Sequence, residues 1–201
     1  MATTPHPART TPDHDVPTRP VDSGVAGAPD PARRRALART AAWIAAALFI
    51  GQFGVGAAAA LTGIDVGDHG NALGRASEAL TGLAFLAGAV AIAALAPRGA
   101  LLTAWIPGIA GLAASGATMV WVVATGAEPA IEVFLAEVAL TALGLVAAGV
   151  LGALRRRVWP WWVGTGVALI IPIMFLVPLN AIPLALVWAA VALTAHPDPR
   201  S

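Results

Sequence analysis

The feature that most constrains this chain is an apolar run from Val158 to Ala195 that contains no charged residue. A continuous helix over that run would measure about 57 Å, nearly twice the ~30 Å thickness of the hydrocarbon core of a bilayer. The run must therefore fold back on itself. Pro178 marks the break, because proline cannot continue a helix interior and restricts the residue before it. We predict two membrane crossings here, at 158–177 and 181–196.

Four earlier stretches are also long enough to cross a bilayer, which takes about 20 mostly apolar residues. The chain is 58% hydrophobic and 11% charged, whereas soluble domains carry about 25% charge. We therefore predict an all-α integral membrane protein, a bundle of about six transmembrane helices. The crossings lie near 40–63, 78–97, 101–124, 130–153, 158–177 and 181–196. Because the last is short, five crossings followed by a re-entrant segment are the alternative.

The N-terminal segment differs in kind from the rest of the chain. It is rich in Pro, Thr, Ala and Asp and has no apolar periodicity. Such a segment cannot bury enough surface to offset the entropy of ordering. We predict a disordered cytoplasmic tail over 1–36, a transmembrane domain over 37–196 and a short C-terminal tail over 197–201.

The distribution of arginine orients the predicted bundle. Arginines gather before the first crossing, between the second and third, and between the fourth and fifth; they are Arg33, Arg34, Arg35, Arg39, Arg98, Arg155, Arg156 and Arg157. Membrane proteins keep their positive charges on the cytoplasmic side, and an even number of crossings then leaves both termini there. All twelve basic residues are arginine, a coding bias of GC-rich genomes. We predict a multi-pass protein of a bacterial plasma membrane.

Glu137 is the most informative single residue. It lies about seven residues inside the fourth predicted crossing, roughly 10 Å deep at 1.5 Å per residue. A carboxylate at that depth costs at least a few kcal/mol unless it is paired or protonated, and it should face the bundle interior. The functional hypothesis is an intramembrane ion or proton site formed by Glu137, Gln52 and Thr141. The structural alternative is a neutral Glu137 hydrogen-bonded to Thr141 or to Gln52.

A second candidate site is acidic and lies opposite the arginine clusters. Its members are Asp65, Asp68, His69, Glu78, Glu128 and Glu132. Carboxylates and an imidazole can bind divalent cations, but the spacing matches no strong metal motif, so we predict no metal and no other cofactor. The alternatives are a solvated loop and, for Glu128 and Glu132, carboxylates that complement a helix dipole.

Small residues recur at four-residue spacing in two predicted crossings. Gly111 and Ser115 form one pair, and Gly144, Ala148 and Gly152 form a stripe. In lipid, helices associate through such small residues, because burying apolar surface gives little drive. We predict that these are helix contact faces; the alternative is chance spacing in a chain rich in Ala and Gly.

The absence of several motifs and of a basic face excludes some classes of function. The sequence has no cysteine and none of the GxxxxGK[ST], HExxH or GxSxG motifs. Its net charge of +1 gives no basic face for nucleic acid. We predict a non-enzymatic protein with a structural, regulatory or partner-subunit role, whose partners are the lipid bilayer and a second copy or another membrane protein. The alternative is a small transporter or a proton- or cation-coupled permease using Glu137. A weaker hypothesis is a membrane enzyme using Asp68, His69 and Glu78.

Overall fold

The computed structural model describes residues 30–154 and 158–195, and all regular structure within them is helical. The elements are α1 (Pro31–Thr62), α2 (Ala72–Leu95), the 3-10 helix η1 (Gly99–Ala104), α3 (Ile106–Thr125), α4 (Ile131–Leu154), α5 (Trp161–Ala168), α6 (Ile170–Leu176) and α7 (Ala181–Thr194). The all-α prediction is confirmed for these residues. Most of the predicted N-terminal tail, the triple arginine at 155–157 and the C-terminal tail lie outside them.

Four helices are long and apolar enough to cross a membrane. They are α1, α2, the η1–α3 unit Gly99–Thr125, and α4. They correspond to the first four predicted crossings. The two later ones are shorter: α7 has 14 residues, and the stretch predicted as one crossing at 158–177 is two short helices, α5 and α6. The break at Leu169 has a local cause, because Pro172 has no N–H for the carbonyl of Ala168 and its ring crowds that carbonyl.

The fold-back predicted at Pro178 is confirmed. Helix α6 ends at Leu176 and α7 begins at Ala181. The side-chain amide of Asn180 donates a hydrogen bond of 2.5 Å to the carbonyl oxygen of Met174, which ties the turn to the end of α6. The last two helices therefore form a hairpin within the described residues.

The start of α1 corrects two predicted boundaries. The helix begins at Pro31, so residues 31–36 of the segment expected to be disordered are helical, and the helix starts well before position 40. The reason is a local signal. Asp30 caps the helix by accepting a hydrogen bond of 2.9 Å from the backbone N–H of Ala32, and proline is favoured at the first helical position. Arg34 Nη2 also donates to the carbonyl of Ala96, at 2.6 Å, and so ties this turn to the end of α2.

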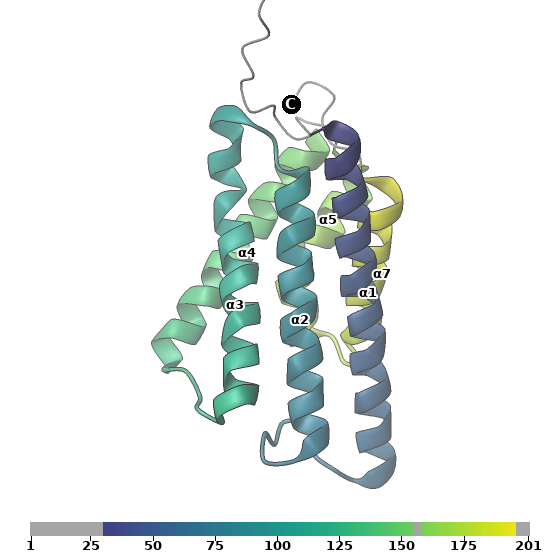
Figure 1. Cartoon of the computed structure of the whole chain (residues 1–201), viewed down its shortest axis with the longest axis vertical. Helices are drawn as coiled ribbons and strands as arrows, with labels where there is room; N and C mark the ends of the chain where they lie inside the picture. The colour runs from purple at the N-terminus through teal and green to yellow at the C-terminus, as the bar shows by residue number, and fades with distance from the viewer. Residues whose placement is uncertain (1–29, 155–157, 196–201) are drawn as a thin grey trace, which may run out of the picture.

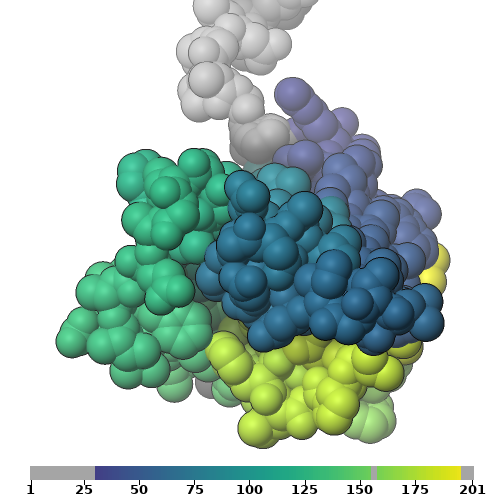
Figure 2. All heavy atoms as spheres, turned by 90° about the horizontal axis from the view of Figure 1, so that it is seen from below, coloured from purple at the N-terminus to yellow at the C-terminus, as the bar shows by residue number. Residues whose placement is uncertain are grey.

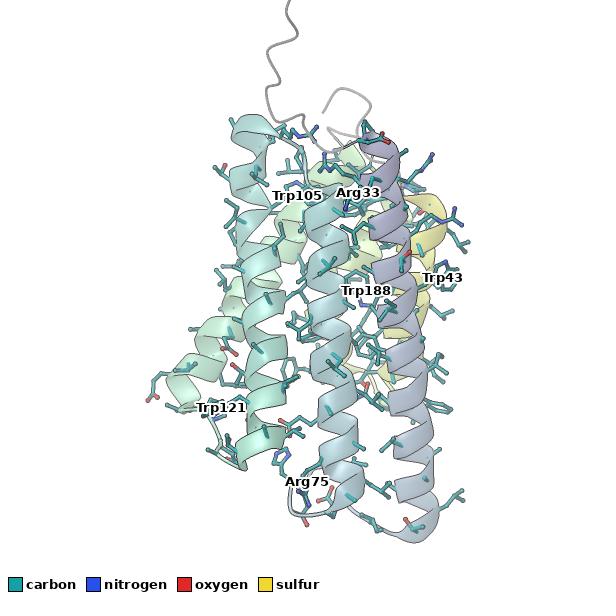
Figure 3. The ribbon with its side chains drawn as sticks, in the orientation of Figure 1. Arg33, Trp43, Arg75, Trp105, Trp121 and Trp188 are labelled. Atoms are coloured by element: carbon teal, nitrogen blue, oxygen red, sulfur yellow. The ribbon has the colours of Figure 1, made fainter. Side chains whose placement is uncertain are left out.

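The helices close into a ring. Helix α1 packs against α2 and α7, α2 against α3, α3 against α4, and α4 against α5, while α5 and α6 pack against α7. Figure 1 shows α1, α2 and α3 side by side, with α4 running obliquely behind α3. Figure 3 identifies the two ends of the bundle by Arg33 and Arg75, called here the Arg33 end and the Arg75 end, with Trp188 between them.

Glycines set how closely the helices approach. A Cβ added at Gly144 of α4 would overlap the backbone of Gly108 of α3, and one added at Gly82 of α2 would come 2.9 Å from the carbonyl oxygen of Gly116 of α3. The predicted contact faces agree with this packing, since Gly111, Ser115, Gly144, Ala148 and Gly152 are all buried. Close contact between α3 and α4 brings their polar side chains within hydrogen-bonding range.

Candidate functional site: a polar pocket between α2, α3, α4 and α6

A pocket of about 450 Å³ lies toward the Arg75 end of the bundle, between α2, α3, α4 and α6. Its volume is in the range typical of small-molecule sites. The polar residues that line it are His69, Glu78, Ser115, Thr118, Glu128 and Glu137; the larger apolar ones are Phe85, Met119, Phe134, Ile171, Met174 and Phe175. Figure 2 views the molecule from this end, where α2, the α3–α4 pair and the α6–α7 turn meet. The pocket is therefore apolar in its walls and acidic in its polar groups.

Glu137 lines this pocket and is held there by an unexpected partner. It is half-buried, six residues into α4, which is about 9 Å along the helix axis. Thr118 of α3 donates a hydrogen bond of 2.7 Å from its hydroxyl to Glu137 Oε1. The predicted orientation of Glu137 toward the bundle interior agrees with this position.

Neither Thr141 nor Gln52 is hydrogen-bonded to the Glu137 carboxylate in the described part of the chain. The hydroxyl of Thr141 donates at 2.7 Å to the backbone carbonyl of Glu137, one turn earlier, and not to its carboxylate. Gln52 lies on α1, away from the pocket, and its Oε1 is buried with no hydrogen-bond partner among the described residues. A signal for Thr118 did exist, because it follows Ser115 by three residues and so continues the small face of α3 that meets α4.

Toward the centre of the bundle the polar lining gives way to apolar packing. Ser115 Oγ and Thr141 Oγ1 lie 3.4 Å apart across the α3–α4 contact, and both side chains are buried. The next layer toward the Arg33 end contains Leu112 and Leu145, which are fully buried. On the Arg33 side of Glu137 the contact between α3 and α4 is thus apolar and buried, and the charged residues that line the pocket lie toward the Arg75 end.

The mouth of the pocket holds a close acid–imidazole pair. His69 Nδ1, in the α1–α2 loop, lies 2.7 Å from Glu78 Oε2, near the start of α2. The Glu78 side chain is 16% exposed and that of His69 38%. Glu128, exposed on the connection from α3 to α4, lines the same pocket. The two side chains form an ion pair when the His69 imidazole is protonated and the Glu78 carboxyl is ionised.

The other members of the predicted acidic site lie elsewhere. Asp65 and Asp68 are exposed in the loop, where their carboxylates accept hydrogen bonds from the backbone N–H groups of Gly67 and Gly70, at 2.8 and 2.7 Å. Glu132 is exposed on the first turn of α4 and does not line the pocket. In the described part of the chain no three His, Asp or Glu side chains are grouped to hold a metal ion.

Aromatic residues complete the pocket, and sequence reasoning missed them. The rings of Phe134 on α4 and Phe175 on α6 meet edge to face, with centroids 6.3 Å apart. Phe85 on α2, which is 1% exposed, forms another part of the lining. Nothing in an apolar stretch distinguishes a pocket-facing phenylalanine from one that faces lipid or core.

Comparisons of the chain with protein-family models, with curated proteins and with solved structures gave no match. The chemistry of the pocket therefore has to be inferred from its own residues.

Proposed function

We propose that this protein is a small multi-pass transporter of a bacterial plasma membrane, coupled to protons or cations through Glu137. In this proposal the chain crosses the membrane six times, through α1, α2, η1–α3, α4, the α5–α6 pair and α7. The Arg33 end is cytoplasmic, because positive charge is retained on that side. The pocket then opens toward the outside.

The observation that carries the proposal is the position of Glu137 in an open pocket. Ionisable residues at membrane depth are costly and mark ion pathways and proton relays by default. Glu137 shares its pocket with His69, Glu78 and Glu128, and Thr118 orients its carboxylate. A purely structural glutamate would instead be enclosed by donors and sealed from the aqueous end.

Coupling follows if one carboxylate binds either a proton or a cationic substrate. The two ligands then compete for Glu137, so that binding one releases the other. Transport also requires a second arrangement in which the pocket opens toward the Arg33 end. The contact of Gly108 with Gly144 and the helix break at Leu169 are the elements whose rearrangement would provide it.

The test is solute-driven proton movement in proteoliposomes that contain a pH-sensitive dye. Three solutes are added outside the liposomes: the cation tetraphenylphosphonium, the anion p-toluenesulfonate and the neutral sugar glucose. We expect at least one to change the internal pH relative to protein-free liposomes, and Glu137→Gln to abolish that change. Glu132→Gln is the matched control, because Glu132 lies on the same helix, is exposed and does not line the pocket.

An internal pH that no solute changes, or changes equally well in Glu137→Gln, would refute coupled transport. The other sequence-based hypothesis, a structural, regulatory or partner-subunit role, would then be favoured. The association with a second copy or another membrane protein stays a prediction under either function.

A further inference from the structure

The pocket carries information about the class of its ligand, and this inference rests on the proposed function of the same site. We propose that the pocket binds an organic cation with an apolar body, such as a quaternary ammonium or phosphonium compound. The charge, the apolar lining and the size of the pocket each restrict the ligand independently.

The charge of the lining favours a cation. Glu78, Glu128 and Glu137 supply three carboxylates and His69 one imidazole, and no arginine is among the pocket-lining residues described. Arg75, on the same helix as Glu78, is exposed and does not line the pocket. An anionic ligand would lie against three carboxylates with no arginine to pair with. A neutral apolar ligand would desolvate the carboxylates without offering them a partner, which is unfavourable.

The apolar lining argues against a simple inorganic ion. Hard cations such as Ca²⁺ take six to eight oxygen ligands, whereas Glu137 is joined in the pocket by Phe134, Phe175, Met119 and Met174. No three-residue metal group occurs among the described residues. A bare ion would also leave most of a 450 Å³ pocket filled with water against apolar walls.

An organic cation satisfies both halves of the lining. Its apolar groups would contact the phenylalanine and methionine side chains, and its charge would lie beside the carboxylates. Aromatic rings attract quaternary ammonium ions through their faces, and methionine adapts its shape to varied apolar ligands. Thr118 engages Oε1 of Glu137 and so fixes the carboxylate at the inner part of the pocket.

The experiment is equilibrium binding to the full chain in detergent, measured by isothermal titration calorimetry. The probe is tetraphenylphosphonium; tetraphenylborate has the same shape with the opposite charge, and choline has the charge with little apolar surface. We expect saturable binding of tetraphenylphosphonium, binding at least tenfold weaker for choline, and none for tetraphenylborate beyond its uptake by empty micelles.

Variants locate the site. Glu137→Gln should weaken binding of tetraphenylphosphonium at least tenfold, and Glu132→Gln should leave it unchanged. Should Glu137→Gln fail to fold, Glu128→Gln serves instead, because Glu128 is exposed outside the helices and still lines the pocket. Equal binding of the phosphonium and the borate, tight binding of choline, or affinity unaffected by the pocket variants would overturn the proposal.

The binding experiment and the transport experiment distinguish failure of this inference from failure of the proposed function. Saturable, Glu137-dependent binding of tetraphenylphosphonium without any solute-driven pH change would support this inference and refute transport. A Glu137-dependent pH change driven by p-toluenesulfonate or glucose, with no phosphonium binding, would support transport and overturn this inference.

Discussion

The contact between α3 and α4 provides a quantitative test of the packing that holds the site. Gly144→Ala adds one methyl group at a point where a Cβ overlaps the backbone of Gly108. Backbone cannot swing aside as a side chain can, so the two helices must separate. Overpacking of this kind costs about 1–3 kcal/mol, and weakening the interhelical hydrogen bond from Thr118 to Glu137 adds about 0.6–1.7 kcal/mol.

The matched control is Gly54→Ala on α1, where nothing lies within 4 Å of the added Cβ. Both substitutions gain the same helix propensity, about 0.8–1.0 kcal/mol, so their difference isolates the contact. We expect Gly144→Ala to be about 2–5 kcal/mol less stable than Gly54→Ala, which is about 30- to 4,000-fold in the unfolding equilibrium constant.

The assay is reversible unfolding by sodium dodecyl sulfate in mixed micelles, followed by tryptophan fluorescence. Equal stability of the two alanine variants would refute the packing of α3 on α4 through Gly108 and Gly144. It would also remove the reason for the approach of Thr118 to Glu137.

Three further predictions test separate parts of the structure. A double-mutant cycle of Thr118→Val and Glu137→Ala, which removes both the donor and the acceptor, should give a coupling free energy of about 0.6–1.7 kcal/mol in the same unfolding assay, and additive effects would contradict their hydrogen bond. Asp30→Ala should destabilise the first turn of α1 by about 1 kcal/mol, seen as faster hydrogen exchange of the amides of residues 32–34, whereas unchanged exchange would argue against the cap. Gly88→Ala places a Cβ 2.5 Å from the Trp188 ring, so near-ultraviolet circular dichroism should change and stability should fall by about 1–3 kcal/mol; an unaltered spectrum would count against that contact.

The sequence predicts this fold well where one local property decides the outcome. The length of each run without charged residues determines which stretches can span a bilayer, and Pro178 determines where the last run folds back. The four-residue spacing of the small residues Gly144, Ala148 and Gly152 also predicts a helix contact face. The helix start at Pro31 also has a local signal, because Asp30 followed by proline is an N-cap pattern. The polar composition of the preceding segment nevertheless led to the prediction of disorder up to residue 36.

The candidate site was harder to predict because it depends on helix rotation and crossing angle. Depth in the membrane identified Glu137, yet several hydroxyl and amide side chains lie at comparable depth. Thr118 of α3 reaches this carboxylate because α3 and α4 cross closely at Gly108 and Gly144. The hydroxyl of Thr141 donates instead to the backbone carbonyl of Glu137. The contact between the rings of Phe134 and Phe175 likewise depends on the rotation of α4 and α6 about their axes. That rotation cannot be predicted from such uniformly apolar sequences.

The central proposal is that water and solutes reach Glu137 from the outer side of the membrane, through the pocket at the Arg75 end. The native chain has no cysteine, so single-cysteine variants report access directly. Val138 lines the pocket, whereas Leu140 is exposed on the helix surface and does not line it. Intact cells are treated with a membrane-impermeant, trimethylammonium-bearing methanethiosulfonate. We predict labelling of Val138→Cys and none of Leu140→Cys; a Val138→Cys that reacts only in inverted membranes, or in neither preparation, would contradict the account.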